Sequence, residues 1–307
     1  METHELLSRI VRLPIVSEGL AEDMLSGSFR SVFKGQGLEF DEARHYEWGD
    51  DARNIDWNAS ARIGTPFIKM FREERELTIL LLLDTSASMQ RRTAAFWSMG
   101  SQSLSPYEQA LIAASLIAFS AERSGQRIGA FLFDRETDRV FLPKKGRRSV
   151  LAFISAALHY HKTGSRFNTG DSKSSNLRSA IIGAQRLLKR RSMVILISDF
   201  LSIGWEQELC NLGRRHDVIA VRTSDPAETN LSDLGLVTME DPETGCQVTA
   251  RTGSALFRDA WSGWHKDRAE LWQNLCTRAG VARLELPVNA DAAAVLRRFF
   301  GGRGFRR

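Results

Sequence analysis

Runs of apolar residues alternate along the chain with segments of helical periodicity. The segment LTILLLLD, residues 77–84, is apolar almost throughout, and SMVILISDF, residues 192–200, has the same character. Unbroken apolar runs of this length are typical of parallel strands that helices cover on both faces. Between them, residues 105–125 have the pattern of a helix, with Ser105 as N-cap, Pro106 at the first helical position and a Glu three residues after the cap.

The same patterns predict the other strands and helices. Strands are predicted at 127–133, 138–143, 216–223 and 281–287, with a strand pair around 241–245; helices are predicted at 147–160, 175–191, 254–279 and 290–299. Strands that alternate with helices predict an α/β fold, a doubly wound and mostly parallel sheet flanked by helices. We expect residues 1–76 to form an N-terminal extension, and 77–307 to form the main domain with C-terminal strand–helix additions.

Composition narrows the class of protein. The chain is 43% hydrophobic and 26% charged, as expected for a globular protein. We see neither a secretory signal nor an apolar run long enough to span a bilayer, and cysteines are few. We therefore expect a cytoplasmic protein that reaches a membrane face only through a partner.

The distribution of charge raises the question of whether the protein binds phosphates. The net charge is +5, and basic residues cluster at 144–148, 189–191 and 306–307. Such clusters can bind phosphates. We interpret them as solvated helix ends and loops, and we do not expect nucleic acid as a partner.

The two buried runs end in acidic residues. Asp84 ends the first, Ser86 and Ser88 follow at alternate positions, and Asp199 ends the second. Ligands of open α/β sheets bind at the carboxyl ends of the strands, where these side chains would converge. Carboxylates and hydroxyls are hard oxygen ligands, so the pattern predicts a site for Mg²⁺, with Mn²⁺ or Ca²⁺ as alternatives. The alternative structural interpretation is that these residues only cap the following turn.

Enzyme motifs are missing. There is no phosphate-binding loop sequence G-x-x-x-x-G-K-[ST] and no nucleophile elbow G-x-S-x-G. The six histidines form no ligand pattern, and we expect surface or capping roles for them. A binding module is therefore favoured over an enzyme.

The segment DTSAS, residues 84–88, resembles the D-x-S-x-S motif of the metal-ion-dependent adhesion site in von Willebrand factor A domains. The resemblance implies a von Willebrand A-like fold in which Asp199 supplies a ligand from a third loop. The family's second-loop threonine corresponds to Ser175 in SSNL, and Thr169 is the other candidate for that ligand. The implied metal ligands are Asp84, Ser86, Ser88, Ser175 and Asp199.

A longer resemblance covers residues 35–300. The segment from Glu39 to Trp57 matches the pattern E-F-x-x-x-R-x-Y-x-x-G-D-D-x-R-x-I-D-W of the bacterial family called domain of unknown function 58. Members of that family usually accompany MoxR-type AAA+ ATPases. Within the charged band of residues 39–62 we expect ion pairing between its arginines and aspartates, and burial of Trp48 and Trp57. The alternative is that this band is a binding surface.

Together the resemblances imply a metal-dependent protein–protein interaction module. Its partner would be a MoxR-type ATPase or that ATPase's client, with a partner carboxylate completing the coordination of the cation. The expected role is an adaptor in the maturation of another complex, or in metal insertion into it. The alternative is a divalent-metal-dependent phosphate-ester hydrolase, which would need a general base that the sequence does not identify.

Overall fold

The computed structural model describes residues 38–48, 50–51, 55–73, 77–91, 104–134, 139–163, 176–241 and 245–302, together with Ile10, Leu13 and Leu20. It divides into two compact units: Phe29–Glu76 forms one, and Met1–Ser28 with Leu77–Arg307 forms the other.

The larger unit is built on a six-stranded sheet in the order β10-β7-β6-β3-β4-β5. Its strands are β3 (Thr78–Asp84), β4 (Arg127–Phe133), β5 (Arg139–Lys144), β6 (Met193–Ser198), β7 (Asp217–Ser224) and β10 (Ala282–Pro287). All neighbouring pairs are parallel except β4 and β5, which are antiparallel. The predicted mostly parallel sheet is therefore confirmed, with an antiparallel strand at one edge.

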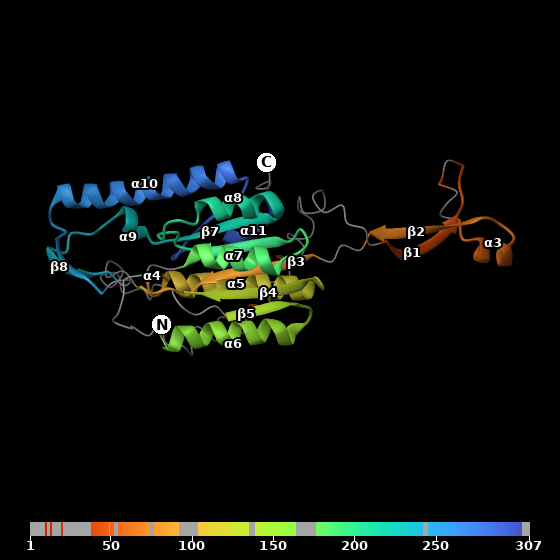
Figure 1. Cartoon of the computed structure of the whole chain (residues 1–307), viewed down its shortest axis with the longest axis horizontal. Helices are drawn as coiled ribbons and strands as arrows, with labels where there is room; N and C mark the ends of the chain where they lie inside the picture. Colours follow the sequence, from red (N-terminus) through yellow and green to blue (C-terminus); the bar gives the residue numbers. More distant parts are fainter. Residues whose placement is uncertain are drawn as a thin grey trace. The chain divides into compact units, whose positions relative to one another are not determined.

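Helices cover both faces of this sheet (Figure 1). The long helices are α5 (Pro106–Arg123), α6 (Arg147–Thr163), α7 (Leu177–Leu187), α8 (Glu206–Arg215), α10 (Ala255–Ala279) and α11 (Ala292–Gly301). The predicted capping box begins α5, because Ser105 Oγ accepts from the Glu108 amide at 3.1 Å and Glu108 accepts from the Ser105 amide at 2.7 Å. Among the described residues, no helix is both long enough and apolar enough to cross a membrane.

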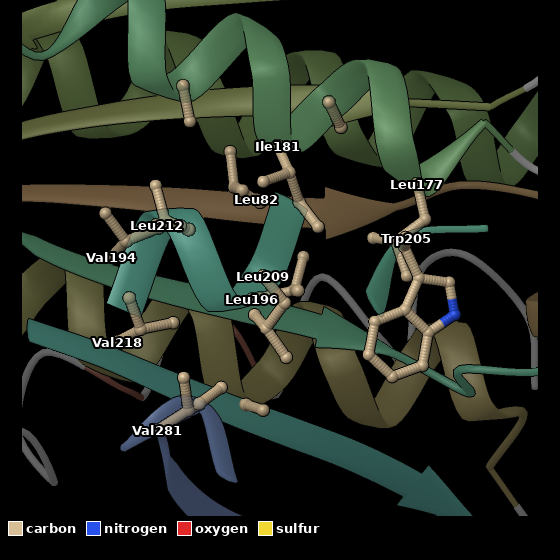
Figure 2. Packing of buried hydrophobic residues seen from close by; sticks show 14 of the residues in the cluster. Leu82, Leu177, Ile181, Val194, Leu196, Trp205, Leu209, Leu212, Val218 and Val281 are labelled. Carbon is tan, nitrogen blue, oxygen red and sulfur yellow. The ribbon is translucent and has the colours of Figure 1, made fainter. Parts of the chain in front are cut away.

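One face of the sheet packs against α7, α8 and α10 (Figure 2). Alternate residues of the central strands point to this side, as the two-residue period of a strand requires. The strand contribution includes Leu80, Leu82, Val194, Leu196, Val218 and Ala220, and the helix contribution includes Ile181, Leu209, Leu212 and Trp272. Leu81 and Leu83 point to the opposite face, which α5 covers together with α6 and α11.

Shorter elements complete this unit. They are α4 (Ala87–Gln90), α9 (Pro226–Thr229) and an antiparallel hairpin of β8 (Leu236–Glu240) and β9 (Gln247–Arg251), which is the predicted strand pair.

The smaller unit contains β1 (Leu38–His45) and β2 (Phe67–Glu73), which pair antiparallel, and the short helix α3 (Trp57–Ile63). Arg44 and Asp50 form the expected kind of ion pair at 2.7 Å. The expected burial of tryptophan is wrong, since Trp48 is 100% exposed and Trp57 is 71% exposed. Helix α3 has no buried residue, because among the described residues of this unit only a two-stranded ribbon lies beside so short a helix.

Candidate metal centre

The order of the strands reverses between β3 and β6. The chain passes from β3 to β4 on one side, and later returns to place β6 on the other side of β3. Such a switch point leaves a crevice outside the carboxyl ends of the two strands, where open α/β sheets bind ligands. Leu83 pairs with Ile197 in the register, so Asp84 lies beside Ser198, and Asp199 follows directly.

The loop after β3 brings both serine hydroxyls to one side. Asp84 Oδ1 accepts from the Ser86 amide at 3.0 Å, and the hydroxyls of Ser86 and Ser88 lie 3.0 Å apart. Thr85 points elsewhere, with its hydroxyl donating to the carbonyl of Phe133 at 3.0 Å. The predicted convergence is present, but α4 begins directly after Ser86, so helical rather than extended geometry carries Ser88 into place.

The structural alternative, in which Ser86 only caps the following turn, does not fit this geometry. Ser86 is the N-cap residue of α4, yet its side chain makes no capping hydrogen bond. An ordinary N-cap serine would accept from an amide in the first turn of the helix. Because its hydroxyl contacts Ser88 instead, capping of α4 does not account for Ser86.

The loop after β6 presents the second carboxylate. Asp199 Oδ1 accepts from the Leu201 amide at 3.0 Å. The other oxygen, Oδ2, is buried and has no hydrogen-bond partner within the described part of the chain. Phe200 turns the loop with a φ of 57°, a left-handed conformation that is uncommon outside glycine and that concentrates at functional sites.

Ser198 is a site residue that the sequence did not indicate. Its hydroxyl donates to Asp84 Oδ2 at 2.6 Å and accepts from the Phe200 amide at 3.1 Å. It therefore fixes one oxygen of Asp84 and also supports the loop that carries Asp199. The sequence feature that could have indicated Ser198 is its position at the end of a buried apolar strand, next to Asp199.

The two carboxylates repel each other inside the protein. Asp84 is fully buried, and burial together with the negative charge of Asp199 raises the pKa of Asp84 to about 7, although hydrogen bonds from Ser198 and Ser86 oppose the shift. Ionising both groups without a cation is therefore costly. A divalent cation between them would remove that cost.

A second buried polar cluster lies close to this site and was also missed. Arg222 on β7 binds Glu228 of α9 and also donates to Glu285 at 2.8 Å. His265 on α10 lies 3.8 Å from Glu228, and burial raises the pKa of Glu228, to which the negative charge of Asp199 also contributes.

His265 and His216 contradict the expected surface roles of the histidines. They are 5% and 4% exposed, and neither ring makes a hydrogen bond within the described residues. Burial, with three nearby arginines, lowers the pKa of His265 to about 4, so this ring is neutral at physiological pH.

Not every predicted ligand can be placed. Ser175 and Thr169 lie outside the described residues. Within those residues no group of three or more His, Cys, Asp or Glu side chains is arranged to hold a metal ion. The candidate centre therefore consists of two carboxylates and the hydroxyls of Ser86 and Ser88, a set suited to a hard cation.

Comparison with known proteins identifies relatives. A family model described as "Protein of unknown function DUF58" matches residues 42–270. An uncharacterised protein of Mycobacterium tuberculosis, Rv1480, is 28% identical over 302 residues, which are 97% of this chain and 90% of that protein. A protein of Mycobacterium avium, MAV169, is 32% identical over 129 residues, 42% of this chain and 76% of its own.

Solved structures with a similar arrangement share little sequence. BatB from Bacteroides thetaiotaomicron is 15% identical, with a TM-score of 0.40 over 71% of this chain and 93% of its own. The VWA domain of SpRpn10 is 11% identical, with a TM-score of 0.36 over 72% of this chain and 94% of its own.

Proposed function

Because the chain belongs to the DUF58 family, whose description names no function, we propose a role from the chemistry of its own site. The chain is a protein–protein interaction module that binds its partner through a divalent cation. Asp84, Ser86, Ser88 and Asp199 hold the cation at the carboxyl ends of β3 and β6.

The observation that supports this proposal best is Asp199 Oδ2. It is a buried carboxylate oxygen without a hydrogen-bond partner among the described residues, in a loop beside a second buried carboxylate. A buried polar atom left unsatisfied costs roughly 1–3 kcal/mol, and more when it is charged. A cation that binds both carboxylates would satisfy this oxygen and screen the repulsion.

The ligand chemistry favours a hard cation. The residues present offer carboxylate and hydroxyl oxygens, which suit Mg²⁺ and also Mn²⁺ or Ca²⁺. Ser175 or Thr169 would add one more hydroxyl from the segment before α7. With so few protein oxygens, coordination positions remain for water and for one oxygen from outside.

A carboxylate from a partner protein is the oxygen that best suits this outer position. A divalent cation held by two protein carboxylates can still attract a further negative charge, which the partner carboxylate would supply. Binding of the partner would then depend on the metal. By resemblance to the family, we propose a MoxR-type AAA+ ATPase or its client as the partner. The chain would then act as an adaptor when that ATPase matures another complex or inserts a metal into it.

The first experiment measures the cation itself. Calorimetric titration of the metal-free protein with Mg²⁺ should show one site, and Asp84→Ala or Asp199→Ala should abolish it. Asp259→Ala, which removes an exposed carboxylate on α10, is the matched control and should bind normally. Equal Mg²⁺ binding by all three variants would place the ion elsewhere.

The second experiment measures the partner. The MoxR-type ATPase of the same organism is titrated with wild-type protein in Mg²⁺ and in chelator. Binding should require Mg²⁺ and should fall sharply in both aspartate variants, whereas Ser175→Ala should weaken it only mildly because water can replace a neutral hydroxyl. Unchanged affinity of a correctly folded Asp84→Ala variant would contradict the metal bridge.

A further inference from the structure

The edge of the sheet formed by β5 and α6 carries an unusual distribution of charge. Residues 139–163, from the start of β5 to the end of α6, contain six Lys and Arg and no Asp or Glu. The remaining 36 Lys and Arg of the chain are matched by 37 Asp and Glu. This segment therefore carries six positive charges, compared with a net charge of +5 for the whole chain, and Figure 1 shows it away from α10.

A groove of about 630 Å³ lies along this edge. Its apolar lining comes from both elements and includes Ile128, Phe141, Val150 and Phe153. Its cationic lining consists of Lys144, Lys145 and Arg148. We call this feature the basic groove.

Exposed aliphatic side chains accompany these cations. Val140 and Leu142, which both line the basic groove, are 43% and 56% exposed, and Leu151 in the first turns of α6 is 48% exposed. An exposed apolar patch rimmed by charged groups is typical of a protein or membrane interaction site. The combination of aliphatic and cationic groups limits what the occupant can be.

Addition of a partner strand to β5 fits poorly. The strand is short, it contains Pro143, and its pairing with β4 is shifted between Ile128 and Ala130. Proline, lysine and bulges are the devices by which proteins prevent strand addition at an open edge. An occupant that pairs with the backbone of β5 is therefore disfavoured.

The chemistry of the surface favours a lipid over a macromolecule. Nucleic acid would be bound by the cations, but it would gain little from Val140, Leu142 and Leu151. Protein interfaces are depleted of lysine and enriched in aromatic residues and arginine, whereas here lysine is as common as arginine and the exposed apolar side chains are aliphatic. Interfacial membrane binding uses this combination, with apolar groups at the acyl boundary and cations at anionic headgroups.

We propose that the β5–α6 edge is a peripheral binding surface for anionic membranes. Lys144, Lys145 and Arg148 contact the headgroup phosphates, and Val140, Leu142 and Leu151 enter the boundary between headgroups and acyl chains. The surface is separate from the candidate metal centre and needs no cation.

The test measures co-sedimentation of the protein with vesicles of phosphatidylcholine, alone or mixed with phosphatidylglycerol, in chelator. We expect binding only to the mixed vesicles. Lys144→Gln/Arg148→Gln should bind about 25-fold more weakly, since each cation at an anionic membrane contributes roughly a factor of five. Lys189→Gln/Arg190→Gln, which removes the same charge from exposed positions away from the groove, should bind like wild type.

A third variant separates membrane insertion from simple charge attraction. Leu142→Ser should weaken binding about tenfold, because the lost methyl and methylene groups no longer leave water. It should leave the melting temperature unchanged, since the side chain is already more than half exposed.

Three outcomes would overturn the proposal. The first is no binding to the mixed vesicles, and the second is equal loss in both charge variants. The third is full binding by Leu142→Ser when Lys144→Gln/Arg148→Gln has lost it, which would show that charge attraction alone holds the vesicle and that no apolar side chain inserts. Asp84→Ala should bind vesicles normally. A failure of the membrane proposal would therefore leave the metal-dependent function untouched, and a failure of the metal-dependent function would leave the membrane proposal untouched.

Discussion

Replacing Asp84 by Asn should stabilise the metal-free protein at neutral pH. Asp84 has a pKa of about 7 in the fold and about 3.8 when exposed to solvent, because burial and the charge of Asp199 disfavour its ionised form. Asn has the same shape and keeps an oxygen to accept from the Ser86 amide. The variant therefore removes the buried charge with little change in packing.

The sign and size of the effect follow from linkage. Between pH 4 and 7 the native state holds a proton on Asp84 that the unfolded state has released, so the free energy of unfolding of wild type falls as pH rises through this range. A shift of about three pKa units corresponds to roughly 4 kcal/mol at most. Relaxation around the site and the altered hydrogen bond from Ser198 reduce this free energy. We therefore expect the free energy of unfolding of Asp84→Asn to exceed that of wild type by about 1–3 kcal/mol at pH 7.5.

The assay is urea unfolding of both proteins in chelator at several pH values. The informative quantity is the difference between them, since other titrating groups cancel. This difference should be near zero at pH 4, grow toward pH 7 and then level off. Saturating Mg²⁺ should reverse it, because the cation stabilises only the wild-type carboxylate.

Asp217→Asn is the matched control for this experiment. Asp217 is also buried but is paired with Arg191 at 2.7 Å, so removing its charge should destabilise the protein instead. If Asp84→Asn lowered stability at pH 7.5 in chelator, as Asp217→Asn should, the two site carboxylates would not repel each other, and the electrostatic argument for a cation would fail.

Three further predictions concern the fold and can be checked by urea unfolding. Trp57→Ala should change the free energy of unfolding by less than about 0.5 kcal/mol, because the ring is 71% exposed; a loss of about 3–5 kcal/mol would mean that the ring is packed after all. Leu82→Ala should cost about 2–5 kcal/mol, since this side chain is fully buried between the sheet and its helices. Glu108→Ala should cost about 1–2 kcal/mol by leaving the buried amide of Ser105 without its acceptor, whereas Glu206→Ala, at the start of α8, should be nearly neutral.

The sequence predicted that Asp84 and Asp199 lie at one edge of the sheet, because both follow a simple rule. Asp84 and Asp199 each end an unbroken apolar run, and parallel strands bring such ends to one edge. Ser198 was missed because a serine within a buried strand has no pattern that separates a hydrogen-bonding role from a packing role. Its partner, Asp84, is far away in sequence and becomes its neighbour only through the register of β3 and β6.

Other misses have a different cause. The cluster of Arg222, Glu228 and His265 depends on the path of α10 after the β8–β9 hairpin, and no local pattern specifies that path. The error at Trp48 and Trp57 arose from composition, because tryptophan is usually buried. Composition cannot show that a segment forms a small unit with too few residues to cover its own aromatic side chains.

If the site binds a cation and a partner as we propose, one carboxylate couples proton binding, cation binding and partner binding. Because Asp84 has a pKa of about 7, a cation that binds below that pH must displace a proton, which weakens it by up to about tenfold for each pH unit. If the partner's carboxylate completes the coordination, the same proton also weakens the partner, since coupling between two ligands of one site is reciprocal. Burial and the charge of Asp199 set the strength of this linkage, because both raise the pKa of Asp84. An adaptor built in this way would release its partner on modest acidification without any change of fold.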